Sequence, residues 1–314
     1  MSDIIRETLI DELTTAIPEE VAQFAESIAG RLDRQPLGIL FYGSVLRDVD
    51  PEGIIDFYVI TDRPESLGGS VLARMANRLL PPNVYYMEHK TEGGTTLRAK
   101  VAFLSLKQFL GRSTLFTLDT TIWARFCQPV RMVWVRDGAS ADHLLQAISQ
   151  CVITASCWAA LLGPEEGGAA QYWHNLFAHT YAAELRVEKK GRSHNLLAGK
   201  EERYGALLKA AWRRASLSYR SEGGVLYPQL TESARSKASR NWRKVHTFGK
   251  PLNIARLIKA AFTFRDGVAY LLWKIQRHTG KAIHVSAFEK RHPLLTLPLF
   301  LWRTRHVRSR KMQH

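Results

Sequence analysis

The residues most able to do chemistry lie in one stretch, 37–62, with the sequence LGILFYGSVLRDVDPEGIIDFYVITD. Two apolar runs, 37–41 and 54–60, are typical of short strands, and the turn Tyr42-Gly43-Ser44 follows the first of them. One acid, Asp56, lies inside the second run, where a carboxylate costs free energy unless it is paired or holds a metal. A Gly-Ser turn offers N–H groups and a hydroxyl to a phosphate. This pattern indicates a triphosphate at Ser44 and a divalent ion at Asp56, or else an ordinary strand–turn–strand with an exposed Asp56.

Other residues with metal-binding or nucleophilic side chains give weaker signals. Asp48 and Asp50 could approach the same ion or simply favour the turn. Asp62 lies about 20 Å along a straight strand from Asp56, too far to share an ion. The eleven histidines form no HExxH motif and no cluster with cysteine, and the three cysteines have no neighbouring base. Three cysteines in a chain of 314 residues also form no disulfide framework.

The elements that position these residues follow from hydrophobic periodicity. We expect helices over 4–15, 19–33, 66–80, 105–111 and 113–126, and strands over 37–41, 54–60, 84–87, 97–104 and 130–135. After residue 141 the pattern predicts helices alone, over 141–162, 169–185, 200–219 and 231–243, with helical spacing again over 252–278. The chain therefore divides into an α/β sheet domain over 1–137, a helical second domain over 138–230 and a basic amphipathic region over 231–314.

The positive charge is concentrated in the last third of the chain. Residues 201–314 hold 24 Lys and Arg against 6 Asp and Glu, a net charge of +18, which leaves a net charge of −3 on residues 1–200. Such a split predicts an anionic partner, either nucleic acid or acidic lipid.

Apolar and basic residues alternate in that last third in a way that favours lipid. Arg256, Lys259, Arg265, Lys274 and Arg277 border the apolar stripe of 252–278, and the tail joins Trp302 to Arg303, Arg305 and Arg308. Helices of this kind lie flat on anionic bilayers, although a buried core stripe with a solvated basic face has the same pattern. Nucleic acid is the weaker interpretation, because no recognition helix, RNP motif or zinc-finger spacing is present. The sequence carries no signal for the oligomeric state.

The ends of the chain bear on its location. The N-terminus, MSDIIRETLIDEL, is acidic and lacks the basic and apolar regions of a secretory signal. No unbroken apolar run reaches the 18 or so residues of a membrane span. We therefore expect a cytoplasmic protein that is peripheral on the inner face of the cell membrane.

Short motifs over residues 37–280 resemble one family. They occur in the same order as in the family, namely Tyr42-Gly43-Ser44, Ile55-Asp56-Phe57, Asn83-Val84-Tyr85-Tyr86, Lys100–Ser105, His179-Thr180-Tyr181, Leu185-Arg186, Glu188, Asn195, Lys200 and Glu202-Arg203-Tyr204-Gly205. On these residues the chain resembles the mitochondrial-type phosphatidate cytidylyltransferases, the translocator-assembly-and-maintenance family of CDP-diacylglycerol synthases, as a bacterial-type member. It departs from the family at Val45, where glycine is usual, and at Ala182-Ala183.

The resemblance implies a nucleotidyltransferase-fold α/β (α+β) domain, an all-helical or winged-helix-like second domain and a membrane-binding C-terminal segment. The implied reaction joins CTP and phosphatidic acid, with Mg²⁺, to give CDP-diacylglycerol and pyrophosphate at an anionic membrane surface. In the implied site Asp56 holds the metal and Lys100 acts with it. Tyr42, Gly43, Ser44, Arg186, Asn195 and Lys200 would bind the nucleotide, and Trp302, Arg303, Arg305 and Arg308 would bind the membrane.

The small number of acidic residues near the proposed site bears on which chemical group accepts the nucleotide. Many nucleotidyltransferases carry two acids two residues apart, but Ile54 stands two residues before Asp56, and the strand 97–104 holds no acid. A phosphate monoester is already ionised at neutral pH and needs no strong base, so we expect a phosphate acceptor rather than a hydroxyl. The alternatives are a nucleotidyltransferase that modifies RNA or protein and a non-catalytic relative that binds membrane or nucleic acid.

Overall fold

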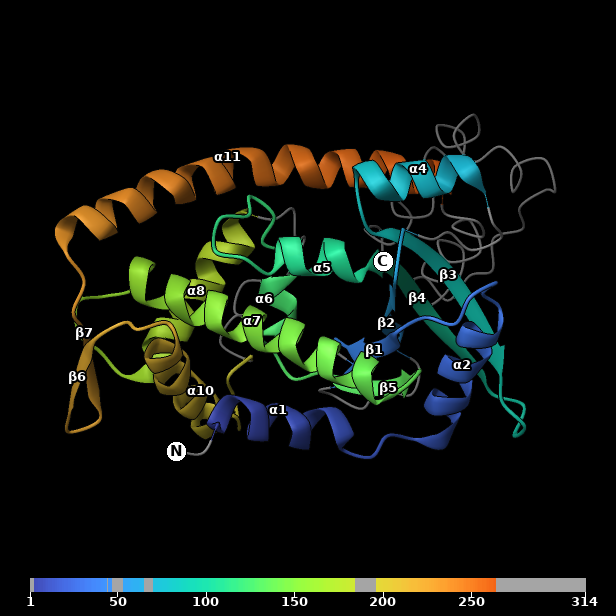
Figure 1. Ribbon diagram of the computed structural model, residues 1–314, viewed down its shortest axis with the longest axis horizontal. Helices are drawn as coiled ribbons and strands as arrows, with labels where there is room; N and C mark the ends of the chain where they lie inside the picture. The colour runs from blue at the N-terminus through green and yellow to red at the C-terminus, as the bar shows by residue number, and fades with distance from the viewer. Residues whose placement is uncertain (1–2, 44, 47–52, 65–69, 184–195, 264–314) are drawn as a thin grey trace, which may run out of the picture.

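In a computed structural model, the protein is a mixed α/β molecule with a five-stranded sheet and, in the described residues, nine helices (Figure 1). The structure describes residues 3–43, 45–46, 53–64, 70–183 and 196–263. The mixed α/β class expected from the sequence is therefore confirmed. Ser44, Arg186, Asn195, Trp302, Arg303, Arg305 and Arg308 lie outside the described residues.

The sheet contains antiparallel and parallel pairs. Its strands lie in the order β3 (Asn83–Lys90), β4 (Thr96–Ser105), β2 (Ile55–Thr61), β1 (Gly38–Tyr42) and β5 (Arg131–Val135). β2 and β4 are parallel, and the other neighbours are antiparallel. The parallel pair needs a crossover connection, and α4 (Val71–Leu79) and β3 lie within it.

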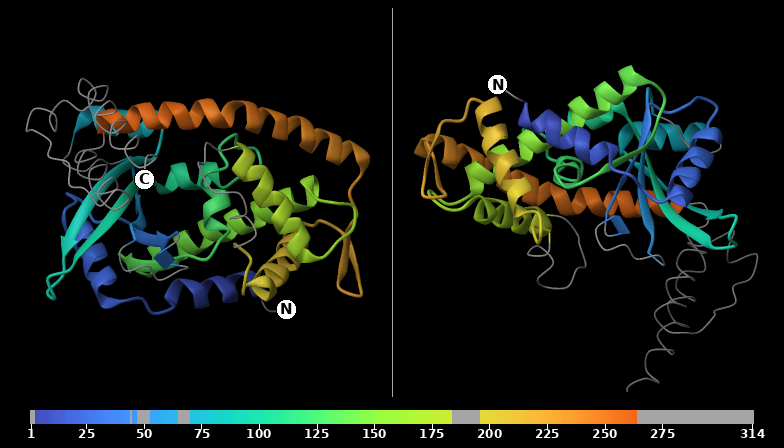
Figure 2. Two further views of the ribbon diagram at one scale, coloured as in Figure 1. Left: turned by 180° about the vertical axis from the view of Figure 1, so that it is seen from behind. Right: turned by 90° about the horizontal axis from the view of Figure 1, so that it is seen from below.

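The helices pack on both faces of the sheet and extend beyond it (Figures 1 and 2). Those not yet named are α1 (Ile4–Thr14), α2 (Glu19–Gly30), α5 (Leu106–Arg112), α6 (Trp123–Phe126), α7 (Gly138–Leu162), α8 (Ala169–Ala183), α10 (Glu201–Arg214) and α11 (Glu232–Thr263). α11 runs along one edge of the molecule, from a small hairpin of β6 (Tyr219–Glu222) and β7 (Val225–Pro228) to the sheet. This path brings the end of α11 to residues 80–83, which lead into β3, and to Asp119.

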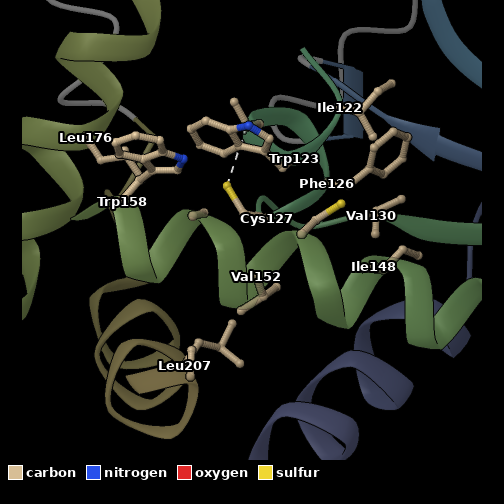
Figure 3. Packing of buried hydrophobic residues seen from close by; sticks show 14 of the residues in the cluster. Ile122, Trp123, Phe126, Cys127, Val130, Ile148, Val152, Trp158, Leu176 and Leu207 are labelled. Carbon is tan, nitrogen blue, oxygen red and sulfur yellow. Dashed lines mark hydrogen bonds between the residues drawn. The ribbon is translucent and has the colours of Figure 1, made fainter. Parts of the chain in front are cut away.

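Alternation along the strands gives the sheet two separate cores. One face, with Ile39, Phe57 and Val101, packs on α2. The other face, with Leu40, Tyr58 and Ala102, joins a larger cluster that includes α1, α6, α7, α8 and α10. Figure 3 shows α7 at the centre of this cluster, with Trp123, Cys127 and Trp158 packed along it. The larger cluster therefore crosses residue 137, where we expect one domain to end.

Among the described residues, one helix, α7, has the length and apolar composition of a membrane span. Of the most apolar 18-residue stretch of α7, 67% is buried inside the protein. Leu144, Ile148 and Val152 are fully buried in the larger cluster. Burial in a protein core explains the apolar character of α7.

Three elements differ from the sequence-based expectation. The helix expected over 113–126 is reduced to α6, because Asp119 accepts from the backbone N–H and the hydroxyl of Thr121 and so favours a turn. The expectation of helices alone after residue 141 is wrong, since Gly223 and Gly224, both with positive φ, close the β6–β7 hairpin. The helix expected over 231–243 and the helical spacing over 252–278 belong, as far as Thr263, to one continuous α11 that includes Pro251. Residues 264–278, with Arg265, Lys274 and Arg277, lie outside the described residues.

Candidate functional site

Three residues predicted from the sequence lie in one row across the sheet. Tyr42 on β1 pairs with Asp56 on β2, and Asp56 pairs with Lys100 on β4. Paired residues of neighbouring strands share a face of the sheet, so the three side chains lie on the face that carries Tyr58 and Ala102. Asp56 and Lys100 are half-buried, which leaves them within reach of a ligand.

Gly43 allows the chain to pass close to Asp56 as it leaves β1. Its φ is +105°, and a Cβ at this position would lie 2.6 Å from Oδ2 of Asp56. Any other residue would be strained and would displace the carboxylate. The glycine predicted to serve a phosphate therefore also leaves space for the carboxylate.

A pocket of about 270 Å³ opens over this row. Cationic side chains from three parts of the chain line it, namely Lys100 on β4, Arg125 on α6, and Arg256 and Lys259 on α11. Asp56 is the one carboxylate among the lining residues that the structure describes. Tyr42, Tyr58, Thr121, Pro82 and Asn253 also contribute to the wall. The pocket is thus a positively charged cavity with one acid on its floor.

The two cations from α11 are held by the chain that follows α4. Nζ of Lys259 donates to the carbonyl oxygens of Leu80 (2.5 Å) and Pro82 (2.6 Å) and to Oδ1 of Asn83 (3.0 Å). Three acceptors match the three N–H groups of an ammonium. Burial lowers the pKa of Lys259 to about 8, with a further contribution from the charges of Arg256 and Arg112. Lys259 therefore fixes one wall of the pocket and adds positive potential.

Arg256 is fixed by a buried acid, Asp119. Its guanidinium forms a two-point ion pair with the Asp119 carboxylate, and its Nε donates to the carbonyl oxygen of Pro81 (3.0 Å). Arg112 pairs with the same carboxylate at 3.1 Å. Burial alone would raise the pKa of Asp119, but the hydrogen bond and charge of Arg256 and the hydrogen bonds of Thr121 outweigh it and lower the pKa to about 2. Asp119 therefore stays ionised and holds α11 against the segment between α5 and α6.

The pocket surroundings also act on Tyr58, which lies on the same strand as Asp56. Burial raises the pKa of the Tyr58 hydroxyl, and the charges of Arg125 and Arg256 oppose this rise. Tyr58 is therefore neutral at physiological pH and presents a hydroxyl rather than a second negative charge.

The pocket offers a magnesium ion one carboxylate ligand, Asp56, from the described residues. Within the described ranges no group of three or more His, Cys, Asp or Glu side chains gathers. Mg²⁺ commonly binds through one or two carboxylates plus substrate phosphates and water. Asp56 fits that pattern as a single carboxylate ligand. Asp48 and Asp50, the other candidates, lie outside the described residues.

The structure brings together part of the predicted site. Tyr42, Asp56 and Lys100 share the pocket, and Gly43 adjoins Asp56. Lys200, whose backbone N–H donates to the carbonyl of Leu197 as α10 begins, is not among the residues that line the pocket. Ser44, Arg186 and Asn195 are not described. Sequence reasoning missed Arg125 and Asp119, and it assigned Arg256 and Lys259 to the border of a membrane-facing stripe.

A larger cavity, of about 740 Å³, lies on the opposite face of the sheet. Its wall is mainly apolar, with Ile17, Phe41 and Ile55 among its residues. Phe41 and Ile55 are the immediate neighbours of Tyr42 and Asp56 in sequence, so the strand alternation turns them away from the charged row. The row predicted from the sequence thus faces the smaller pocket, while Glu19, Glu20, Glu92 and Arg131 line the larger cavity.

No protein-family model matches the chain, and no curated protein matches it.

Proposed function

We propose that the protein is a phosphatidate cytidylyltransferase, which makes CDP-diacylglycerol and pyrophosphate from CTP and phosphatidic acid at a membrane surface. The observation that carries the proposal is the row of Asp56 and Lys100 in a pocket with three further cations. One acid beside several cations suits a polyphosphate that brings a divalent ion with it.

The size of the pocket supports binding of phosphates rather than of a whole nucleotide. Its volume of about 270 Å³ lies just below the range of roughly 300–1,000 Å³ that is usual for drug-sized ligands. We infer that the phosphate groups enter the pocket while the base and the acyl chains lie outside it. This arrangement places the reacting phosphorus near Asp56 and Lys100.

The residues of the pocket have separate tasks in the proposed reaction. An oxygen of the lipid phosphate attacks the α-phosphorus of CTP, the new P–O–P bond forms, and pyrophosphate leaves with the electrons of the broken bond. Lys100 and Arg125 offset the charge of the phosphoryl oxygens, while Arg256 adds positive potential from the wall. When bound at Asp56, Mg²⁺ would supply further charge neutralisation on the triphosphate.

The chain needs no strong general base for this acceptor. Asp119 is tied to two arginines and has a pKa of about 2, so it is a poor proton acceptor. Tyr58 stays protonated because burial raises its pKa. A phosphate monoester, with a second pKa near 6, reaches the pocket as an anion and attacks without losing a proton.

An acceptor comparison tests the proposal. The full-length protein is incubated with CTP, Mg²⁺ and vesicles of phosphatidic acid, or with vesicles of diacylglycerol, and the lipid products are identified by mass spectrometry. We expect CDP-diacylglycerol from phosphatidic acid and no nucleotide transfer to the hydroxyl of diacylglycerol. Transfer to alcohols, RNA or protein without any CDP-diacylglycerol would overturn the proposal in favour of another acceptor class.

A further inference from the structure

Helix α4 presents its apolar side to solvent. The exposed fractions are 62% for Val71, 78% for Leu72, 57% for Met75 and 81% for Leu79. The side that faces the protein is formed instead by Asn77, which is fully buried, and by half-buried Ala73. An amphipathic helix of a globular protein normally turns its apolar side inward, so the orientation of α4 is inverted.

Polar contacts fix this inverted orientation. Nδ2 of Asn77 donates to the carbonyl oxygen of Phe103 on β4 (3.2 Å), and the carbonyl oxygen of Asn77 accepts from Nε2 of Gln108 on α5 (2.9 Å). Nδ2 of Asn83 donates to the carbonyl oxygen of Ala73 (2.7 Å). Rotating α4 to bury its leucines would break these bonds and leave buried polar groups without partners, which is costly. The apolar side is therefore held outward by the fold.

The charges of α4 match an anionic bilayer. Its sequence, VLARMANRL, contains Arg74 and Arg78 and no acid. Leucine, methionine and valine on one side, with arginine beside them, form the pattern of a helix that lies in the interface of an acidic membrane.

The position of α4 links this surface to the pocket. Leu80, Pro81 and Pro82 follow α4 directly, and their carbonyl oxygens accept from Arg256 and Lys259. Pro82 itself lines the pocket. The exposed Leu79 is thus three residues from the pocket wall. Figure 1 shows α4 at the edge of the molecule opposite α1.

We propose that α4 is a membrane-contacting helix. It lies on an anionic bilayer with its four exposed apolar side chains below the headgroups and its two arginines at the lipid phosphates. It thereby holds the mouth of the pocket at the lipid surface. This contact uses other residues than the C-terminal tail. It predicts that the protein binds lipid whether or not the pocket transfers nucleotides.

Vesicle co-sedimentation of the full-length protein tests the inference. The double variant Leu72→Ser/Leu79→Ser is compared with the wild type on vesicles of phosphatidylcholine with phosphatidylglycerol, in the absence of CTP. We expect the partition coefficient to fall by at least about tenfold, because each leucine loses burial in the bilayer. The thermal midpoint should be unchanged, since both side chains are already exposed. A matched control, Ile10→Ser/Val135→Ser, changes residues 40% and 37% exposed on α1 and β5 and should bind vesicles as the wild type does.

The arginines provide a second variant. Arg74→Gln/Arg78→Gln should weaken binding to vesicles that contain phosphatidylglycerol and leave binding to pure phosphatidylcholine unchanged, because the lost attraction is electrostatic. Unchanged vesicle binding in both double variants would overturn the inference. A lower thermal midpoint or a changed oligomeric state in the leucine variant, with unchanged vesicle binding, would also overturn it, because protein would then cover α4.

One further comparison separates this inference from the proposed function. Asp56→Asn should bind vesicles as the wild type does, because Asp56 lies in the pocket and not on α4. Vesicle binding that depends on α4 in a protein without transferase activity would support the inference and contradict the proposed function. Transferase activity, with vesicle binding that does not depend on α4, would support the proposed function and contradict the inference.

Discussion

Gly43 and Asp56 lie in direct contact across the first two strands of the sheet. A Cβ on Gly43 would approach Oδ2 of Asp56 to 2.6 Å, and the φ of Gly43 is +105°. The glycine is thus required both by its backbone conformation and by the space that the carboxylate occupies. The position of the acid and the path of the turn are therefore set together.

Replacing Gly43 by alanine should displace Asp56 and lower the rate of CDP-diacylglycerol formation by about 100-fold, which is the effect expected of a displacement near 1 Å. The measurement is the steady-state rate with CTP and phosphatidic acid. Gly94→Ala is the matched control, because Gly94 also has a positive φ, +80°, but a Cβ there would meet nothing within 4 Å. Both variants should lose about 1–2 kcal/mol of stability from backbone strain. Equal activity in the two variants would show that the contact does not matter.

Replacing Arg256 by methionine should destabilise the protein by about 3 kcal/mol, because Asp119 would lose one partner of a buried ion pair. The side chains of Arg256 and Asp119 are only 13% and 8% exposed. Urea unfolding, followed by tryptophan fluorescence, measures the change. Arg243→Met, at an exposed position of the same helix, should change the free energy of unfolding by less than about 0.5 kcal/mol. Similar unfolding midpoints for the two variants would argue that the ion pair does not hold α11 in place.

Acid should remove the contribution of Asp119 in a defined range of pH. Its pKa is lowered to about 2 in the folded protein, against an ordinary value of about 4. A lowered pKa stabilises the folded state above the unfolded-state value, and this stabilisation is lost as the pH falls through the folded-state value. The advantage of the wild type over Asp119→Asn in free energy of unfolding should therefore shrink by about 2 kcal/mol between pH 4 and pH 2. A difference that stays constant with pH would show that the carboxylate is not the stabilising group.

Two ion pairs that join α1 to α10 and to α7 should differ in their effect on stability. Glu12 and Arg203, 13% and 10% exposed, form a two-point pair in which Arg203 also donates to the carbonyl oxygen of Cys127. Glu12→Gln should cost about 3 kcal/mol. Asp142→Asn breaks the ion pair with Arg6, in which the side chains of Asp142 and Arg6 are 68% and 53% exposed. This change should cost less than about 1 kcal/mol. Thermal unfolding of both variants checks the order, and a larger loss in Asp142→Asn would contradict it.

The sheet and most helices could be predicted because their signals are local. β1, β2 and β4, which are five to ten residues long, follow from mainly apolar segments, and Asp56 stood out as the one acid in its segment. The row of Tyr42, Asp56 and Lys100 needed the strand register as well, which one sequence does not contain. Parallel pairing of β2 with β4 joins residues 44 positions apart, and its register depends on the packing of both faces.

The contribution of α11 to the pocket could not be predicted, because it depends on contacts across most of the chain. Arg256 meets Asp119 at a separation of 137 residues, and Lys259 meets Leu80 at 179. A basic residue beside an apolar stripe has the same sequence pattern whether it faces lipid, solvent or a buried acid. The turn at Asp119 was missed for a related reason, since a side chain that bonds to the backbone interrupts a helix without changing the apolar spacing.

The central claim, that Asp56 serves nucleotide transfer to a lipid phosphate, is tested most directly by one rate measurement. Formation of CDP-diacylglycerol from CTP, Mg²⁺ and phosphatidic acid is compared for the wild type, Asp56→Asn and Asp62→Asn. Asp62 is the matched control, because it lies just beyond the same strand and pairs on the surface with Arg136 at 2.9 Å. The proposed function predicts activity in the wild type and in Asp62→Asn, and a loss of at least about 1,000-fold in Asp56→Asn. Full activity in Asp56→Asn, or no CDP-diacylglycerol from the wild type, would contradict it.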